Sequence, residues 1–68
     1  MLSIVAVIVT HEPGIDRLTN VLHSVLRQVD NVVIVDNDSR NKDLIKDLCR
    51  VSGKCLFIEI GFFMLLKF

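Results

Sequence analysis

The sequence predicts an α/β fold with elements in the order β-α-β-α-β. Three short apolar runs, many of whose residues are β-branched, lie at 3–9, 32–35 and 55–60. Between them, 15–29 and 44–51 repeat apolar residues at steps of three and four. Short strands that alternate with amphipathic helices imply a parallel sheet with right-handed crossovers. The expected architecture is therefore half of a three-layer, Rossmann-like parallel sheet, truncated after its third strand.

The first strand and helix follow from residues 3–30. Residues 3–9 form an almost unbroken apolar run, which predicts a strand buried on both faces. Pro13 is expected in the first turn of the helix, because its missing N–H would be unpaired there anyway. The helix should end near Gln28 to Asp30. Its apolar stripe predicts packing on the sheet and comprises Ile15, Leu18, Leu22, Val25 and Val29.

The second half of the chain repeats this pattern. Residues 36–39, Asp-Asn-Asp-Ser, close the second strand with side chains that favour turns and caps. Either Asn41 or Ser39 is expected to cap the second helix. Gly53 supplies its C-terminal stop, and 55–60 forms the third strand. Leucine, isoleucine and valine at helical spacing mark the helix at Leu44, Ile45, Leu48 and Val51.

Composition narrows the class of protein. The chain has 68 residues, 51% of them hydrophobic, which argues against disorder but leaves a marginal core. Eight basic and eight acidic residues cancel, so no electrostatic case exists for binding nucleic acid or an anionic membrane. The opening run lacks a basic signal-peptide region and is too short to span a bilayer. Glu59 and Gly61 interrupt the later apolar segment. We therefore expect a cytoplasmic protein without a transmembrane segment.

The two cysteines, Cys49 and Cys55, are too few for a zinc cage. Free cysteine is among the most often buried residue types. We therefore expect two reduced thiols in the core.

Polar and small residues follow each predicted strand. Ligands on parallel sheets bind beyond the carboxyl ends of the strands. Those ends are followed here by Thr10, His11 and Glu12, then by residues 36–39, and then by Gly61. This placement indicates a binding edge, but many functions share the architecture, so no reaction follows from it.

Three motifs carry a resemblance to a known family. They are Ile-Val-Thr-His-Glu-Pro at 8–13, Val-Ile-Val-Asp-Asn-Asp-Ser at 33–39 and Ile-Glu-Ile-Gly at 58–61. Together with 18–30, they resemble the opening of family 2 glycosyltransferases, in particular the rhamnosyltransferase-like branch. That family typically has Val-Thr-Tyr-Asn-Pro, Val-Asp-Asn-Gly-Ser and Ile-Glu-Leu-Gly at these places. The resemblance covers residues 3–61.

The resemblance implies a nucleotide-sugar site, with a UDP- or dTDP-linked sugar, such as rhamnose, as donor. Thr10 and His11 would lie along the nucleoside with Glu12 beside them, and Asp36 would accept a hydrogen bond from the base. The other reading of Asp36 is a turn-forming, helix-capping residue. Asp38 and Gly61 complete the implied nucleotide-binding set.

Two departures from the family pattern bear on this assignment. His11 replaces the family's aromatic residue; its ring can still stack, although an isolated histidine is also a common exposed loop residue. Asp38 replaces the family's glycine. If that position requires a positive φ, aspartate tolerates it less well than glycine.

No metal or catalytic residue is expected within this chain. Asp36, Asn37 and Asp38 spell a D-x-D pattern, but two carboxylates in a turn are too few oxygen ligands for Mg²⁺ or Mn²⁺. The resemblance implies that the family's divalent metal is bound by later residues, which this chain lacks. No candidate general base for sugar transfer is identified either.

Residues 62–68 are apolar and do not resemble the family, which continues here with Glu-Asn-x-Gly. We expect a truncated or frame-shifted protein that is inactive in sugar transfer and associates with itself through this tail. Two alternatives stay open. The chain is either a nucleotide-binding module without catalysis or a remnant that folds only beside a partner chain.

Overall fold

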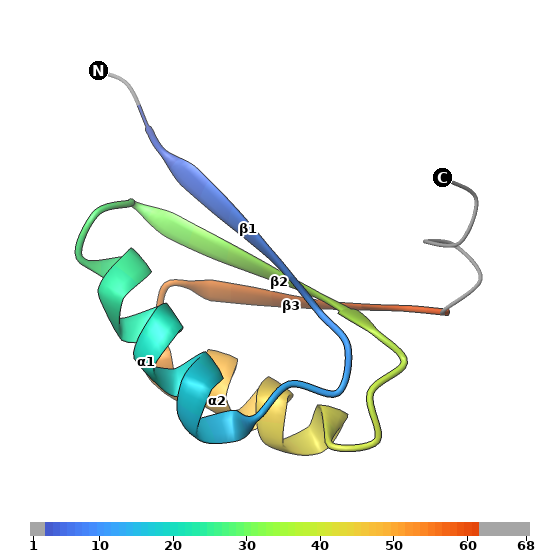
Figure 1. Cartoon of the computed structure of the whole chain (residues 1–68). Helices are drawn as coiled ribbons and strands as arrows, with labels where there is room; N and C mark the ends of the chain where they lie inside the picture. The colour runs from blue at the N-terminus through green and yellow to red at the C-terminus, as the bar shows by residue number, and fades with distance from the viewer. Residues whose placement is uncertain (1–2, 62–68) are drawn as a thin grey trace.

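A computed structural model describes residues 3–61 and confirms the α/β fold class (Figure 1). The predicted tail at 62–68 lies outside the described residues. Neither helix of the described part is long and apolar enough to cross a membrane. The elements are β1 (Val5–Thr10), α1 (Ile15–Leu26), β2 (Asn31–Asn37), α2 (Lys42–Ser52) and β3 (Cys55–Ile60).

The sheet has the strand order β1-β2-β3, and both pairings are parallel. Both connections therefore step in the same direction along the sheet. Two right-handed crossovers that run in the same direction along a sheet place both of their helices on the same face of it. Figure 1 shows α1 and α2 together on one side of the sheet. The described residues thus form two layers of the expected three-layer arrangement.

The core lies between this pair of helices and the sheet. Its centre is β2, where alternate side chains Val32 and Ile34 are buried against both helices. The helices contribute one buried pair each, and the whole cluster is Leu18, Leu22, Val32, Ile34, Ile45 and Cys49. The helical stripes predicted from the sequence therefore do face the sheet.

The prediction that the first strand is buried on both faces is wrong. Val5, Val7 and Val9 are 52%, 63% and 57% exposed, while Ala6 and Ile8 pack against the core. Successive side chains of a strand point to opposite faces, and here the helices cover one face only. A continuous apolar run shows that both faces suit burial, but it does not show what covers them.

Two helix boundaries differ from the sequence prediction. Helix α1 begins at Ile15 with Gly14 as its N-cap, so Pro13 precedes the helix instead of occupying its first turn. The helix ends at Leu26, earlier than expected. For α2, Asn41 takes the N-cap position and Gly53 ends the helix with φ 95°, as the sequence indicates.

The prediction of two reduced thiols is also wrong, because Cys49 and Cys55 form a disulfide. Cys49 lies near the end of α2, and Cys55 opens β3 directly after the turn at Gly53. This turn brings their Cα atoms to 5.2 Å, within the usual range for a disulfide. The bond links the second helix to the third strand.

Candidate functional site

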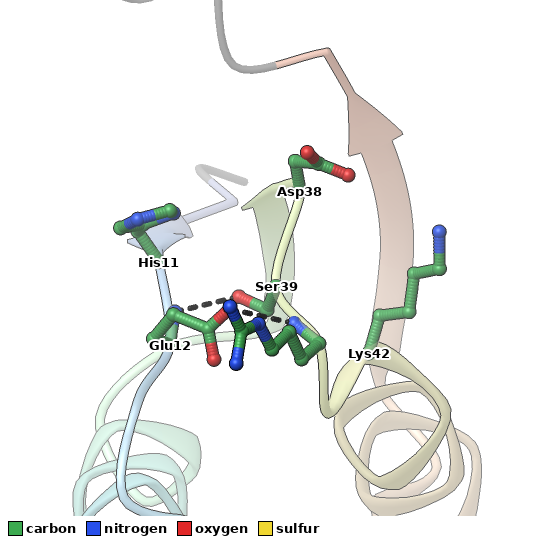
Figure 2. A pocket seen from close by; sticks show the side chains of 6 residues that line it. His11, Glu12, Asp38, Ser39 and Lys42 are labelled. Carbon is green, nitrogen blue, oxygen red and sulfur yellow. Dashed lines mark hydrogen bonds between the residues drawn. The ribbon is translucent and has the colours of Figure 1, made fainter.

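The loops that follow β1 and β2 lie side by side at the carboxyl edge of the sheet (Figure 2). Their strands are neighbours, and the register pairs Thr10 with Asp36 at this edge. Four hydrogen bonds cross between the loops: His11 Nδ1 to Asn37 O at 2.6 Å, Glu12 N to Ser39 Oγ at 2.7 Å, Arg40 N to Glu12 Oε1 at 2.8 Å, and Asn41 Nδ2 to Pro13 O at 3.0 Å. The two loops therefore form one connected structure.

Asp36 is the buried centre of this structure, with no exposed surface. Its Oδ1 accepts hydrogen bonds from the hydroxyls of Thr10 at 2.7 Å and Ser39 at 2.6 Å. Its Oδ2 accepts one from the backbone N–H of Ser39 at 3.0 Å. Both oxygens are thus engaged within the protein, as a turn-forming aspartate requires.

These contacts also determine the protonation of Asp36. Burial by itself would raise the pKa of the carboxyl group, because the charged form loses hydration. The hydrogen bonds from Ser39 and Thr10 favour the carboxylate and, with the nearby His11, leave the pKa below its ordinary value. Asp36 is therefore a carboxylate at neutral pH.

His11 presents an exposed ring at the same edge. The carbonyl oxygen of Asn37 can only accept a hydrogen bond, so Nδ1 of His11 must carry the proton that joins them. In the neutral ring, Nε2 is then the nitrogen with a free lone pair. The hydrogen bond fixes the tautomer and leaves the ring face and Nε2 available to a ligand.

The loops contain both non-glycine residues with positive φ in the described chain, Glu12 at 49° and Asp38 at 54°. The sequence left open whether position 38 requires a positive φ, and the structure shows that it does adopt one. Glu12 was not predicted to do so. Such a conformation is unfavourable for residues other than glycine, asparagine and aspartate.

We predict that Asp38→Ala destabilises the protein by about 1 kcal/mol and that Asp38→Gly does not. The Asp38 side chain is exposed, so the difference should arise from the backbone. Urea denaturation followed by circular dichroism measures both variants. Equal stability of the alanine and glycine variants would contradict this explanation.

A depression of about 670 Å³ opens between the two loops. Figure 2 shows its lining, which combines two acids, two bases, a histidine and a serine: His11, Glu12, Asp38, Ser39, Arg40 and Lys42. Lys42 is held by Glu59 of β3 at 2.8 Å, and this hydrogen bond raises the pKa of the lysine. Among residues 3–61, the Arg40 guanidinium has no ion-pair partner.

The structure brings together only part of the sequence-predicted site. His11, Glu12 and Asp38 line the depression, whereas Thr10 and Asp36 are buried beneath the loops. Gly61 follows β3 and is exposed, but it does not line the depression. Ser39 was expected at the binding edge but not in the nucleotide-binding set, and it lines the depression. Sequence reasoning missed two further lining residues, Arg40 and Lys42, which follow the Asp-Asn-Asp-Ser segment within three residues.

Two amide oxygens near this edge lack a hydrogen-bond donor. They are Oδ1 of Asn37, at the end of β2, and Oδ1 of Asn41, at the start of α2. Both are buried, and neither accepts a hydrogen bond within the described residues. Buried polar atoms are normally paired, and residues 3–61 supply no donor to either of these two oxygens.

Several carboxylate oxygens at this edge already accept hydrogen bonds from the protein itself. Asp36 and Asp38 are the carboxylates of the D-x-D pattern, but both oxygens of Asp36 already accept hydrogen bonds. Glu12 accepts one from the Arg40 backbone. Across residues 3–61, no group of three or more histidine, cysteine, aspartate or glutamate side chains is arranged to hold a metal ion.

A scan against protein-family models, a search of curated proteins and a search of solved structures found no match to this chain. Inferences about the site therefore depend on its residues and their geometry. An exposed imidazole, an exposed carboxylate and an exposed guanidinium share the rim of one depression. These groups can stack on a ring, accept a hydrogen bond and neutralise an anion, which are the tasks of a polar small-molecule site.

Proposed function

We propose that this chain is the nucleotide-binding opening of a protein of the family 2 glycosyltransferase type. Its ligand would be a UDP- or dTDP-linked sugar, such as a rhamnose donor. The observation that carries this proposal is the pair of connected loops at the carboxyl edge of two parallel strands, with His11, Asp38 and Arg40 around one depression. This edge is where parallel α/β sheets bind ligands.

The backbone supports the family assignment independently of the side chains. The family motif Thr-Tyr-Asn-Pro has asparagine where this chain has Glu12, and Asp-Asn-Gly-Ser has glycine where it has Asp38. These two positions are the ones with positive φ. Asparagine and glycine are the residues that adopt this conformation most readily. The family's residue choices thus match the backbone of this chain at both places.

The base, the ribose and the diphosphate of a nucleoside diphosphate could each meet a complementary group in the site. The His11 ring offers a surface for stacking on a base, and the exposed Asp38 carboxylate can accept from a base N–H or a ribose hydroxyl. The Arg40 guanidinium, which has no ion-pair partner among residues 3–61, suits a diphosphate, which it can bind through two N–H groups.

In this proposal Asp36 has a different role from the base contact implied by the resemblance. Its oxygens hold Thr10 and Ser39, and through Ser39 they also hold the backbone of Glu12. Asp36 therefore shapes the loops that carry the ligand-contacting residues. The carboxylate that contacts the ligand would then be that of Asp38.

The proposal includes binding without catalysis by this chain alone. Sugar transfer requires neutralisation of the leaving diphosphate and a base for the acceptor. Within residues 3–61, Arg40 is the cation of the depression that has no ion-pair partner. Glu12 accepts a hydrogen bond from Arg40 N, and Glu59 is paired with Lys42. Self-association through 62–68 and a cytoplasmic location also remain proposals.

The test is a titration of the purified chain with UDP and dTDP, followed by amide chemical shifts. We expect saturable shifts at His11, Asp38 and Arg40. His11→Ala should weaken binding about tenfold, because base stacking on an aromatic ring contributes about 1–3 kcal/mol. The same protein should show no sugar transfer from either donor.

His23→Ala is the matched control, because His23 is an exposed histidine near the end of α1 and does not line the depression. It should bind as the unchanged chain does. Absence of saturable shifts at millimolar nucleotide, or an equal loss in both histidine variants, would reject the proposed site. Asp36→Ala is unsuitable here, since it disrupts the loops themselves.

A further inference from the structure

The face of the sheet opposite the helices is an apolar surface, which we call the open face. Its members follow from strand alternation and register. One row pairs Val7 with Val33 and Leu56, and the next pairs Val9 with Val35 and Ile58. Val5 extends the surface along β1. All seven side chains are aliphatic and none carries a charge.

The open face is exposed to an unusual degree for aliphatic side chains. Val5, Val7, Val9, Leu56 and Ile58 are between 40% and 63% exposed. Strands about 4.8 Å apart that rise about 3.3 Å per residue give a footprint roughly 15 Å on each side. Such a surface offers on the order of 400–500 Å² of apolar accessible area, which is as large as the largest patch of a typical monomer.

We propose that the open face is the interface of a symmetric dimer, in which a second copy of this chain packs its own open face against the first. Two sheets that pack face to face lie about 10 Å apart and interdigitate their inner side chains. A two-fold axis requires one surface to be complementary to itself. An uncharged aliphatic surface satisfies this condition, because its copy brings no unpaired charge. The exposed Asn31, the register partner of Val5, lies at the margin of this surface.

Area and charge are both compatible with a second copy as the partner. Two open faces would bury roughly 800–1,000 Å² in total, at the lower limit of the area of a specific interface. The formal net charge is zero at pH 7, so copies do not repel one another at long range. None of the seven side chains lines the depression at the carboxyl edge, so the dimer interface and the proposed nucleotide site are different surfaces.

Sedimentation equilibrium of the full chain tests this proposal. We expect the mass of two chains of 7.7 kDa each at tens of micromolar protein. Val7→Lys, at the 63% exposed position of β1, should give a monomer with an unchanged circular dichroism spectrum. Val51→Lys is the matched control: Val51 is a 76% exposed valine on α2, away from the open face, and this variant should remain dimeric.

Two further variants keep the test decisive. If Val7→Lys does not fold, Val7→Thr preserves the β-branched shape and should raise the dimer dissociation constant about tenfold, because each copy then buries a hydroxyl group. Leu66→Lys tests the apolar tail as the alternative interface. A monomeric unchanged chain, a dimer that tolerates both Val7 substitutions, or a dimer that only Leu66→Lys dissociates would overturn the proposal.

Discussion

Replacing Asp36 by alanine is expected to destabilise the protein by about 3–5 kcal/mol, because three buried donors then lose a charged acceptor. Domains have roughly 0.05–0.15 kcal/mol of stability per residue, so this loss is comparable to the whole free energy of unfolding of a chain of 68 residues. Urea denaturation monitored by circular dichroism would detect it. Asp47→Ala, which removes an exposed partner of Arg50, should cost less than about 0.5 kcal/mol.

The effect of Asp36 should depend on pH in a defined direction. The folded pKa lies below the unfolded one, so the carboxylate contributes its stabilisation above the unfolded pKa. That contribution is lost as pH falls through the folded pKa. Asp36→Asn has no titrating group at this position. Between pH 6 and pH 3, the stability gap between it and the unchanged protein should therefore stay constant until the pH nears the ordinary aspartate value of 3.8 and then narrow. A gap that is constant over this range would contradict a charged Asp36.

Reduction of the disulfide between Cys49 and Cys55 is the second change with a large expected effect. The bond closes a short loop, with a sequence separation of 6 residues. A cross-link that closes a loop of this length lowers the conformational entropy of the unfolded chain, which should stabilise the folded protein by about 2 kcal/mol. For a domain of this size, that corresponds to a fall in Tm of roughly 10 °C. Thermal melts with and without a phosphine reductant measure the effect directly.

The double variant Cys49→Ala, Cys55→Ala is the control for the reductant, and its Tm should not respond to phosphine. An unchanged Tm for the disulfide-bonded protein after complete reduction would show that the bond contributes no stability. Cytosolic thiols are normally kept reduced. At the cytoplasmic location expected from the sequence, the protein would therefore have the lower stability of its reduced form.

Much of the fold was predictable because local sequence signals and tertiary packing agree. The β-branched run that contains Val7 and Ile8 forms a strand, and the stripe that contains Leu18 and Leu22 faces the sheet. Gly53 ends the second helix with a positive φ that few other residues tolerate. These choices depend on side-chain period and backbone conformation, which neighbouring residues largely determine.

The position of the candidate site in the fold could be predicted from the sequence, but the roles of its individual residues could not. Polar residues after consecutive parallel strands must meet at one edge, so His11 and Asp38 were expected there and do line the depression. The sequence left two roles open for Asp36. Its full burial among Thr10 and Ser39 depends on the register of β1 and β2, which pairs residues 26 positions apart.

The sequence by itself determined the order of elements in this protein and the position of its polar edge, because both follow from periodicity and from where polar residues interrupt apolar runs. The tertiary structure alone decided three other matters: which face of the sheet the helices cover, that Cys49 meets Cys55, and that Asp36 turns inward while Arg40 has no ion-pair partner among the described residues. Each of these depends on distances between segments that are separate in the chain. Such distances are established only when the crossovers and the strand register are in place.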